Sequence, residues 1–203
     1  MLLSRLCGIA AAASVSAVAS AGFINIASNS ALSTESLGGF TGSLDWNFLG
    51  GHDGVLTVSL TNTSPLANGG FLVAFVFRSS TTFTSSLSTT SDVDFLNIPA
   101  GESGSPFGSY DAGAGLGGSF LGGGNPNPGL AVGASGVFTF AISSASAAAL
   151  SAESFIGGPS DFLVRFRGFE DGGSDKTPGQ IIPTPGAIAL LSFAGIVRNR
   201  RRR

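Results

Sequence analysis

Short apolar segments recur along most of the chain, and Gly, Ser, Thr and Asn separate them about every ten residues, a spacing that favours many short strands. In residues 40–48, apolar residues or Gly alternate with Thr, Ser, Asp and Asn. This period of two predicts a strand with one buried face. Residues 55–62 repeat the alternation. The Gly-Gly-His-Asp-Gly sequence between the two segments predicts a hairpin loop, so we expect them to pair antiparallel.

Other segments also have the patterns of strands. Residues 71–77 are apolar at every position, which predicts a strand that is buried on both faces near the middle of a sheet. Residues 93–98, 136–142 and 161–169 predict three more strands, and the last two alternate apolar and polar residues. Residues 79–91 are almost wholly Ser and Thr, which indicates a solvated loop or an edge strand.

The remaining segments lack a strand pattern. Residues 101–136 carry much of the glycine and include Gly-Gly-Gly-Asn-Pro-Asn-Pro-Gly, which predicts a long surface loop. Residues 146–153 are rich in Ala and are the one candidate helix of this region. Residues 172–180 are interpreted as a linker. Together these patterns predict an all-β fold, with a single β-sandwich domain of jelly-roll-like type in residues 22–180.

The N-terminal segment has the features of a secretory signal peptide. Residues 1–21 contain an early positive charge at Arg5, then an apolar stretch, and then Ala19-Ser20-Ala21. This order of a basic, an apolar and a small-residue region predicts cleavage between Ala21 and Gly22. We therefore expect a helical signal peptide in residues 1–21 and a mature chain that begins at Gly22.

The C-terminal segment, residues 181–203, combines a Pro-Thr-Pro turn, an apolar run of 12 residues and a basic tail. As a helix, the run spans about 18 Å, whereas the hydrocarbon core of a bilayer is about 30 Å thick. The arginines should hold their end on the cytoplasmic side. A transient membrane anchor is therefore favoured over the alternative, a core helix with a solvated basic end. The residues that carry this prediction are Pro183, Thr184, Pro185, Gly186, Arg198, Arg200, Arg201, Arg202 and Arg203.

The order of these three parts resembles a PEP-CTERM sorting signal, in which a membrane exosortase recognises a Pro-Glu-Pro-like motif, a hydrophobic helix and an arginine-rich end. Thr184 stands where that family has Glu. The segments NPNPGLAVGASGVFTF and FLVRFRGFEDGGSDK are similar, more loosely, to the β-rich exported domains that precede such signals. The resemblance implies a protein of a Gram-negative-type bacterium that is exported to the cell envelope, the cell surface or the extracellular matrix. It also implies an exosortase-type peptidase as partner and an attachment to the membrane through the C-terminal helix before processing.

Charge and cysteine content narrow the function of the domain between these two ends. Its twelve acidic residues against four basic ones give a formal charge of −8. Such a domain is a poor nucleic-acid binder, because the phosphate backbone would repel it. The only cysteine, Cys7, would leave with the signal peptide, so no disulfide is expected to stabilise the domain. We expect stability to come from packed apolar surface, and the 17 Phe are the obvious source.

Two sequence features superficially indicate an enzyme. The run Gly113-Ala114-Gly115-Leu116-Gly117-Gly118 satisfies the G-x-G-x-x-G pattern of dinucleotide sites. That site needs a strand before it and a helix after it, so we interpret the run as a flexible loop. His52 is the only histidine, and no nucleophile-elbow motif accompanies it. A glycosidase would need two facing carboxylates, and no motif singles out such a pair. We predict no catalytic residues and no enzyme.

Calcium is the metal that the composition leaves open, because it takes carboxylate and carbonyl oxygens from loops. Asp92 with Asp94, and Glu170 and Asp171 with Asp175, could contribute such ligands. Neither group follows the spacing of the twelve-residue calcium loop. We therefore predict no cofactor and no defined metal site.

The function that this reasoning favours is structural or adhesive, at the cell surface or in an extracellular polysaccharide matrix. The alternative is an extracellular glycan-binding module, since such modules bind sugars on exposed aromatic side chains. Trp46 shares the inward parity of its strand, which would leave Tyr110 as the one amphipathic aromatic residue free for a sugar platform. The many Phe residues are interpreted as core residues and not as part of such a platform.

Overall fold

The computed structural model describes residues 22–183, which form twelve strands and three short 3-10 turns. Ten strands make one antiparallel sheet in the order β5-β10-β3-β2-β1-β12-β11-β4-β9-β6. These strands are β1 (Phe23–Ser28), β2 (Phe40–Gly50), β3 (Asp53–Asn62), β4 (Gly69–Phe77), β5 (Thr84–Thr90), β6 (Phe95–Ile98), β9 (Ala112–Leu116), β10 (Ser135–Ser143), β11 (Phe162–Phe169) and β12 (Ser174–Ile182). In this part of the chain no helix has the length and apolar character needed to span a bilayer.

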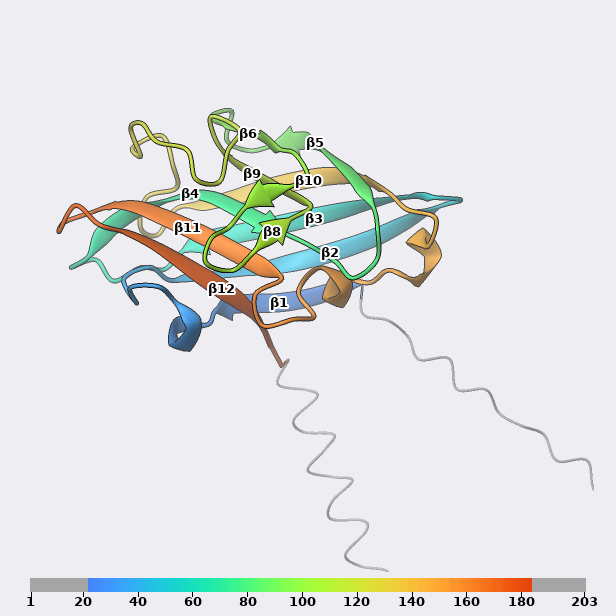
Figure 1. Ribbon diagram of the computed structural model, residues 1–203, viewed down its shortest axis with the longest axis horizontal. Helices are drawn as coiled ribbons and strands as arrows, with labels where there is room; N and C mark the ends of the chain where they lie inside the picture. Colours follow the sequence, from blue (N-terminus) through green and yellow to red (C-terminus); the bar gives the residue numbers. More distant parts are fainter. Residues whose placement is uncertain (1–21, 184–203) are drawn as a thin grey trace, which may run out of the picture.

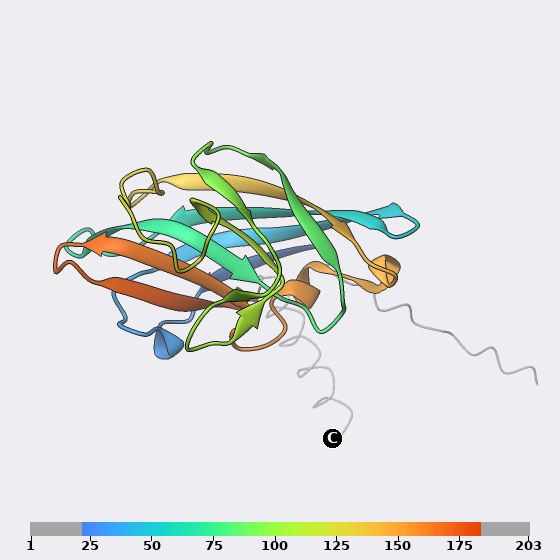
Figure 2. The ribbon, with the colours of Figure 1, turned by 45° about the horizontal axis from the view of Figure 1, so that its top comes forward.

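The sheet folds back on itself into two layers (Figures 1 and 2). One layer holds β5, β10, β3, β2 and β1, and the other holds β12, β11, β4, β9 and β6. The two edges of the sheet approach each other. The backbone N–H of Leu87 on β5 donates to Oδ1 of Asn97 on β6 at 2.7 Å. The fold is thus an all-β single domain, a sandwich whose sheet is nearly closed into a barrel.

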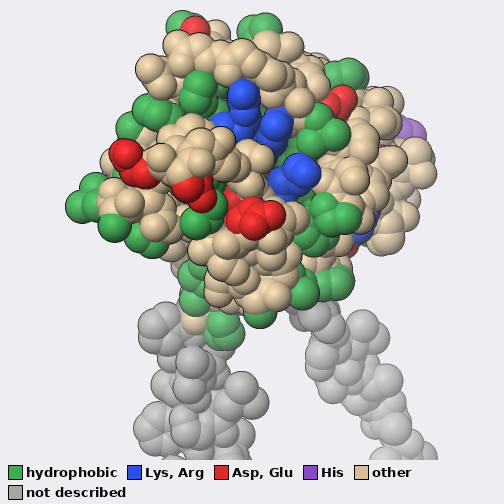
Figure 3. All heavy atoms as spheres, turned by 60° about the vertical axis from the view of Figure 1, so that its left-hand side comes forward, with side chains coloured by type: hydrophobic (Ala, Val, Ile, Leu, Met, Phe, Trp, Pro, Cys, Tyr) green, Lys and Arg blue, Asp and Glu red, His purple; other side chains and the backbone are tan. Residues whose placement is uncertain are grey.

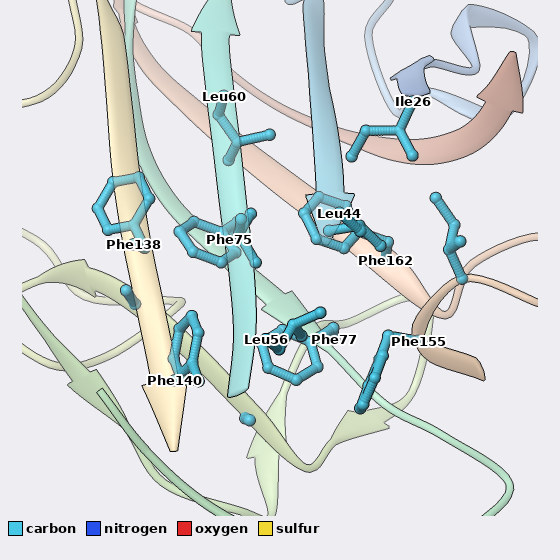
Figure 4. Packing of buried hydrophobic residues seen from close by; sticks show 14 of the residues in the cluster. Ile26, Leu44, Leu56, Leu60, Phe75, Phe77, Phe138, Phe140, Phe155 and Phe162 are labelled. Carbon is cyan, nitrogen blue, oxygen red and sulfur yellow. The ribbon is translucent and has the colours of Figure 1, made fainter. Parts of the chain in front are cut away.

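The inner core fills the space between the two layers (Figure 4). Phe75 of β4 lies at its centre, with ring centroids 4.9 Å from Phe138 and 5.8 Å from Phe162. The alternation in residues 55–62 is confirmed, since the inward side chains of β3 are buried. The predicted hairpin of β2 and β3 is also confirmed. Trp46 is 7% exposed and packs on Phe155 at 5.6 Å, as its parity predicted.

A second, smaller cluster lies on the outer side of β4, and we call it the outer core. The segments before and after β9, residues 99–111 and 117–123, cover this face with Tyr110 and Phe120. Their course includes a short hairpin of β7 (Glu102–Ser103) and β8 (Ser109–Tyr110). This cover explains why β4 is apolar on both faces. The outer core consists of Ala74, Val76, Ile98, Tyr110, Phe120 and Leu163.

The expectation that residues 101–136 form one long loop is wrong. Residues 112–116 form β9, which pairs with both β4 and β6. Gly113 allows a close approach here, because a Cβ at that position would lie 2.2 Å from the backbone oxygen of Phe75. The first half of the G-x-G-x-x-G run is therefore a buried strand, and our interpretation of the run as a flexible loop fails for it.

Two further expectations need correction, and one strand was not foreseen. Residues 146–153 form no two-turn helix but contribute to the 3-10 turns η2 (Ala147–Ala149) and η3 (Ala152–Phe155), because so short a helix cannot offset its nucleation. The expected linker in residues 172–180 belongs largely to β12, which lies between β1 and β11. The unforeseen strand is β1, which begins at Phe23. The Ser/Thr-rich segment forms the edge strand β5, which was one of the two structures predicted for it. The third 3-10 turn, η1 (Ser30–Leu32), lies between β1 and β2.

Candidate functional site

The structure describes few of the residues on which the expected sorting signal depends. Pro183 is exposed and directly follows the last residue of β12, Ile182. Gly22, the expected first residue of the mature chain, is exposed at the other end. The expected site residues that lie outside the described residues are Ala19, Ala21, Thr184, Pro185, Gly186, Arg198, Arg200, Arg201, Arg202 and Arg203.

The acidic residues considered for calcium do not come together. Among residues 22–183, no three His, Cys, Asp or Glu side chains are grouped so that they could hold a metal ion. Asp92 accepts a hydrogen bond from the backbone N–H of Asp94 at 3.1 Å, which is an ordinary turn. Glu170 and Asp171 are exposed, whereas Asp175 is fully buried. In the described part of the chain, no three of these carboxylates are therefore grouped as metal ligands.

The Asp175 carboxylate instead holds the segment that follows η1. It accepts hydrogen bonds from the backbone N–H groups of Leu37 and Gly38, both at 2.8 Å, and from the Ser33 hydroxyl at 2.6 Å. Thr34 and Glu35 also donate to it. Burial alone would raise the pKa of Asp175, but these hydrogen bonds hold that pKa below its ordinary value. Asp175 therefore fixes residues 33–38 against β12, and its oxygens are already occupied.

Tyr110 is not free for a sugar platform, so that expectation is wrong. It is 1% exposed, and its hydroxyl donates to the backbone oxygen of Ser160 at 2.7 Å. The Arg78 guanidinium lies 5.0 Å from the centre of its ring. Burial raises the pKa of Tyr110 to about 12, although the charge of Arg78 opposes the rise. The single Trp and the single Tyr of the chain are thus both buried. His52 is exposed in the turn between β2 and β3.

A group of three basic side chains stands out on the outer face of β11 and β12, and we call it the cationic cluster. Arg165 and Arg167 lie two positions apart on β11, and Lys176 of β12 is directly opposite Arg165 in the register. These are three of the four basic residues in residues 22–183. Figure 3 shows basic side chains, in blue, gathered on one face, with acidic side chains, in red, close beside them.

The outer core fixes the position of Arg165. Burial of Phe120 brings the following backbone over β11, and Nη1 of Arg165 donates to the backbone oxygens of Phe120 and Gly122 at 2.7 and 2.8 Å. Nε of Arg165 is buried without a hydrogen-bond partner. Burial lowers the pKa of Arg165, and the neighbouring charge of Arg167 lowers it further. The pKa of Lys176 is lowered by burial and by Arg165, against an opposing effect of Asp175.

None of the three cations forms a salt bridge within the described residues, where the one ion pair joins Arg78 to Asp161 at 2.9 Å. Arginine presents a planar array of donors that matches carboxylate and sulfate oxygens. The arrangement is therefore suited to bind an anion. The sequence placed Arg165 and Arg167 on one face of a strand. It missed Lys176 because residues 172–180 were interpreted as a linker, although Asp171-Gly172-Gly173, where that segment begins, is a hairpin signal.

A shallow groove of about 530 Å³ crosses the outer face of the other layer. Its lining combines small hydroxyl side chains of adjacent strands, such as Thr41, Ser43, Ser59 and Thr61, with apolar residues, such as Val137 and Ile182. None of its lining residues is charged. The two outer faces of the domain thus differ, since one presents neutral hydroxyl groups and the other presents cations.

Comparison with known proteins adds little to this description. No protein-family model and no curated protein matches the chain. Among solved structures, the chain is similar to a yeast GGA1 GAE domain, with 9% identity and a TM-score of 0.35 over 71% of this chain and 91% of that chain. A similarity this low carries no argument about function.

Proposed function

We propose that the chain is an exported bacterial surface or extracellular-matrix protein with a structural or adhesive role, sorted by an exosortase-type membrane peptidase. The observation that carries the proposal is the position of the Pro-Thr-Pro motif relative to the fold. Strand β12 ends at Ile182, and the exposed Pro183 is the next residue. A peptidase that cuts at or after Pro183 would leave every described strand in place, so processing and folding would be separable.

The position of the two ends of the domain also supports this proposal. Strands β1 and β12 are neighbours, and Asn25 is opposite Ile182 in their register. The described chain therefore begins and ends side by side (Figure 1). Such a domain can be held from one place while its other surfaces face outward. The jelly-roll-like type of sandwich expected from the sequence stays a prediction.

Mass spectrometry of the surface protein from its native host tests the proposal. We expect a C-terminus between Pro183 and Gly186 and no peptide from Ala187 onward. Recovery of an intact Arg203 on most surface molecules would contradict it and would leave an ordinary tail anchor in its place.

The arginines should be needed for processing but not for folding. Replacement of residues 200–203 by Ser should let unprocessed protein pass through the membrane, because moving guanidinium groups through hydrocarbon costs several kcal/mol each. The matched variant with Lys at these positions keeps the charge and should be processed normally. The melting temperature of the domain should be the same in both variants. Normal processing of the Ser variant would contradict this role of the charge.

A glycan-binding module is the second candidate, and the hydroxyl-lined groove is the observation that favours it. Burial of Trp46 and Tyr110 removes the aromatic platform on which such modules commonly rely, so binding would depend on hydrogen bonds. A glycan array probed with the full chain tests this candidate. Binding of neutral glycans that is lost on replacing Ser59 by Leu, but kept on replacing the distant Ser88, would support it.

A further inference from the structure

The cationic cluster forms no salt bridge within the described residues, although the domain is rich in carboxylates. Residues 22–180 have a formal charge of −8, yet no acidic side chain forms a salt bridge with Arg165, Arg167 or Lys176. Like charges directly opposite each other on paired strands are destabilising. Arg165 and Lys176 are such a pair. Folding therefore keeps these cations together without a salt bridge, and the nearby Asp175 offsets their repulsion only in part, at Lys176.

The cluster is also held ready for a ligand. Arg165 is fixed by the backbone oxygens of Phe120 and Gly122. Arg167 makes a single hydrogen bond, at 3.4 Å to the oxygen of Gly122, which leaves most of its N–H donors free. The Lys176 ammonium makes no hydrogen bond within the described part of the chain. One cation is thus rigid, and the two beside it have donors to offer.

We propose that the cationic cluster binds a carboxylate or sulfate group of an acidic polysaccharide. The guanidinium of Arg167 fits two oxygens of one such group, and the ammonium of Lys176 supplies a point charge beside it. The acidic domain repels a dense polyanion such as nucleic acid, whereas a polysaccharide presents its anionic groups farther apart. This inference depends on the proposed export in one respect only, since export is what would bring the protein into contact with an acidic polysaccharide. The binding experiment below does not depend on export or processing.

Isothermal titration of the full chain in a non-ionic detergent tests the site, with polygalacturonate, neutral dextran and inorganic sulfate as probes. Arg198 and residues 200–203 are replaced by Ser in every protein, so that the tail contributes no charge. We expect polygalacturonate to bind, dextran not to bind, and the affinity to fall as salt is added, since the Debye length is about 10 Å at 0.1 M ionic strength. Sulfate should bind far more weakly than the polymer.

The matched variants separate a local site from net charge. Arg167→Gln with Lys176→Gln removes two positive charges from the cluster and should weaken binding by about tenfold or more. Leu49→Glu with Val93→Glu makes the same change in net charge at residues that are 62% and 85% exposed, and should leave the affinity within about twofold. Equal losses in the two variants would overturn the proposal, as would binding of dextran or of sulfate at the strength of the polymer.

Nuclear magnetic resonance is a second test, and it does not depend on whether the Gln variant folds. It uses the chain with its original residues at positions 49, 93, 167 and 176. Addition of polygalacturonate should shift the amide signals of residues 165–167 and 174–176 and leave those of the groove at Thr41 and Ser59 unchanged. Shifts confined to the groove would overturn the proposal.

Discussion

The inner and outer cores are built from the same kinds of side chain, but they are assembled differently. The inner core draws on both layers of the sheet, and its aromatic rings contact one another across the whole interior. The outer core has six residues and depends on two covering segments, residues 99–111 and 117–123, which contribute Tyr110 and Phe120. The inner core therefore determines the fold, whereas the outer core determines where one surface places its side chains.

The difference extends to the polar groups at the boundary of each core. Asp175 fixes residues 33–38 against β12, and all of its hydrogen bonds serve the fold. Phe120 anchors the outer core, while its backbone oxygen holds Arg165 in the cationic cluster. We therefore expect substitutions in the inner core to affect mainly stability, and substitutions in the outer core to affect mainly the cluster.

The largest effect is expected for Phe75→Ala, in the inner core. Phe75 is fully buried between rings of both layers, so the cavity cannot easily collapse. The free energy of unfolding should fall by about 3 to 5 kcal/mol. Chemical denaturation of the chain measures this change. A loss under about 1 kcal/mol would show that the two layers do not pack as described.

The next effect is expected for Asp175→Asn. One carboxylate oxygen would become an amide group facing backbone donors, so the free energy of unfolding at neutral pH should fall by about 2 to 3 kcal/mol. The exposed Asp94→Asn is the control and should change it by less than about 0.5 kcal/mol.

Acid should remove this difference. The folded pKa of Asp175 is lowered, so its stabilisation is present above the ordinary pKa and is lost as the pH falls through the folded pKa. In denaturation curves at decreasing pH, the difference between the original chain and Asp175→Asn should begin to shrink below about pH 4 and should disappear only once the pH is below the folded pKa. If the difference in unfolding free energy stayed constant down to the lowest pH, this would contradict hydrogen bonding to an ionised Asp175 carboxylate.

A smaller effect is expected for Phe120→Ala, in the outer core. The covering segment can relax into the space, so the loss of unfolding free energy should be about 2 kcal/mol. The partly exposed Leu121→Ala is the control and should lose less than about 1 kcal/mol. A loss for Phe120→Ala as large as that for Phe75→Ala would mean that the two cores do not differ in the way described.

The smallest effect is expected for Tyr110→Phe, which removes the hydrogen bond to Ser160 and should lower the free energy of unfolding by about 1 kcal/mol. Because Tyr110 is the only tyrosine, ultraviolet absorbance follows its titration alone. The midpoint should lie at about 12. Because the folded pKa is raised, Tyr110 contributes its full stabilisation at pH values below its ordinary pKa of about 10. This stabilisation is lost as the pH rises from that value through the folded pKa. A midpoint near 10 would place Tyr110 in solvent.

The part of the fold that local patterns encode could be predicted from the sequence. The hairpin of β2 and β3 has an alternating pattern and a turn of glycines, and its inward side chains are buried as expected up to Trp46, whereas Phe48, next to the irregular pairing at the turn, is 42% exposed. Strand β4 is apolar on both sides, and both sides are covered. In these segments the side chains that decide burial lie within the strand itself.

The rest depends on contacts between segments far apart in the chain. Two inward positions of β12 hold Asp175 and Thr177, which are buried because residues 33–38 hydrogen-bond to them. Their polarity hid the strand, and with it the partner of Arg165 in the cationic cluster. Strand β9 was missed because its glycines fit against β4, and glycine alone predicts a loop. The function of the tail stays a prediction.

The position of β12 also has a mechanical consequence. The strand is paired along one side with β1 and along the other with β11, and the chain leaves it at Ile182. Antiparallel hydrogen bonds lie at right angles to their strands, so a pull on Ile182 along β12 loads two rows of bonds in shear. Bonds loaded together resist tension better than bonds that peel one after another. A domain tethered at this end would therefore bear force along a strand that is held by β1 over residues 179–182 and by β11 over residues 174–178.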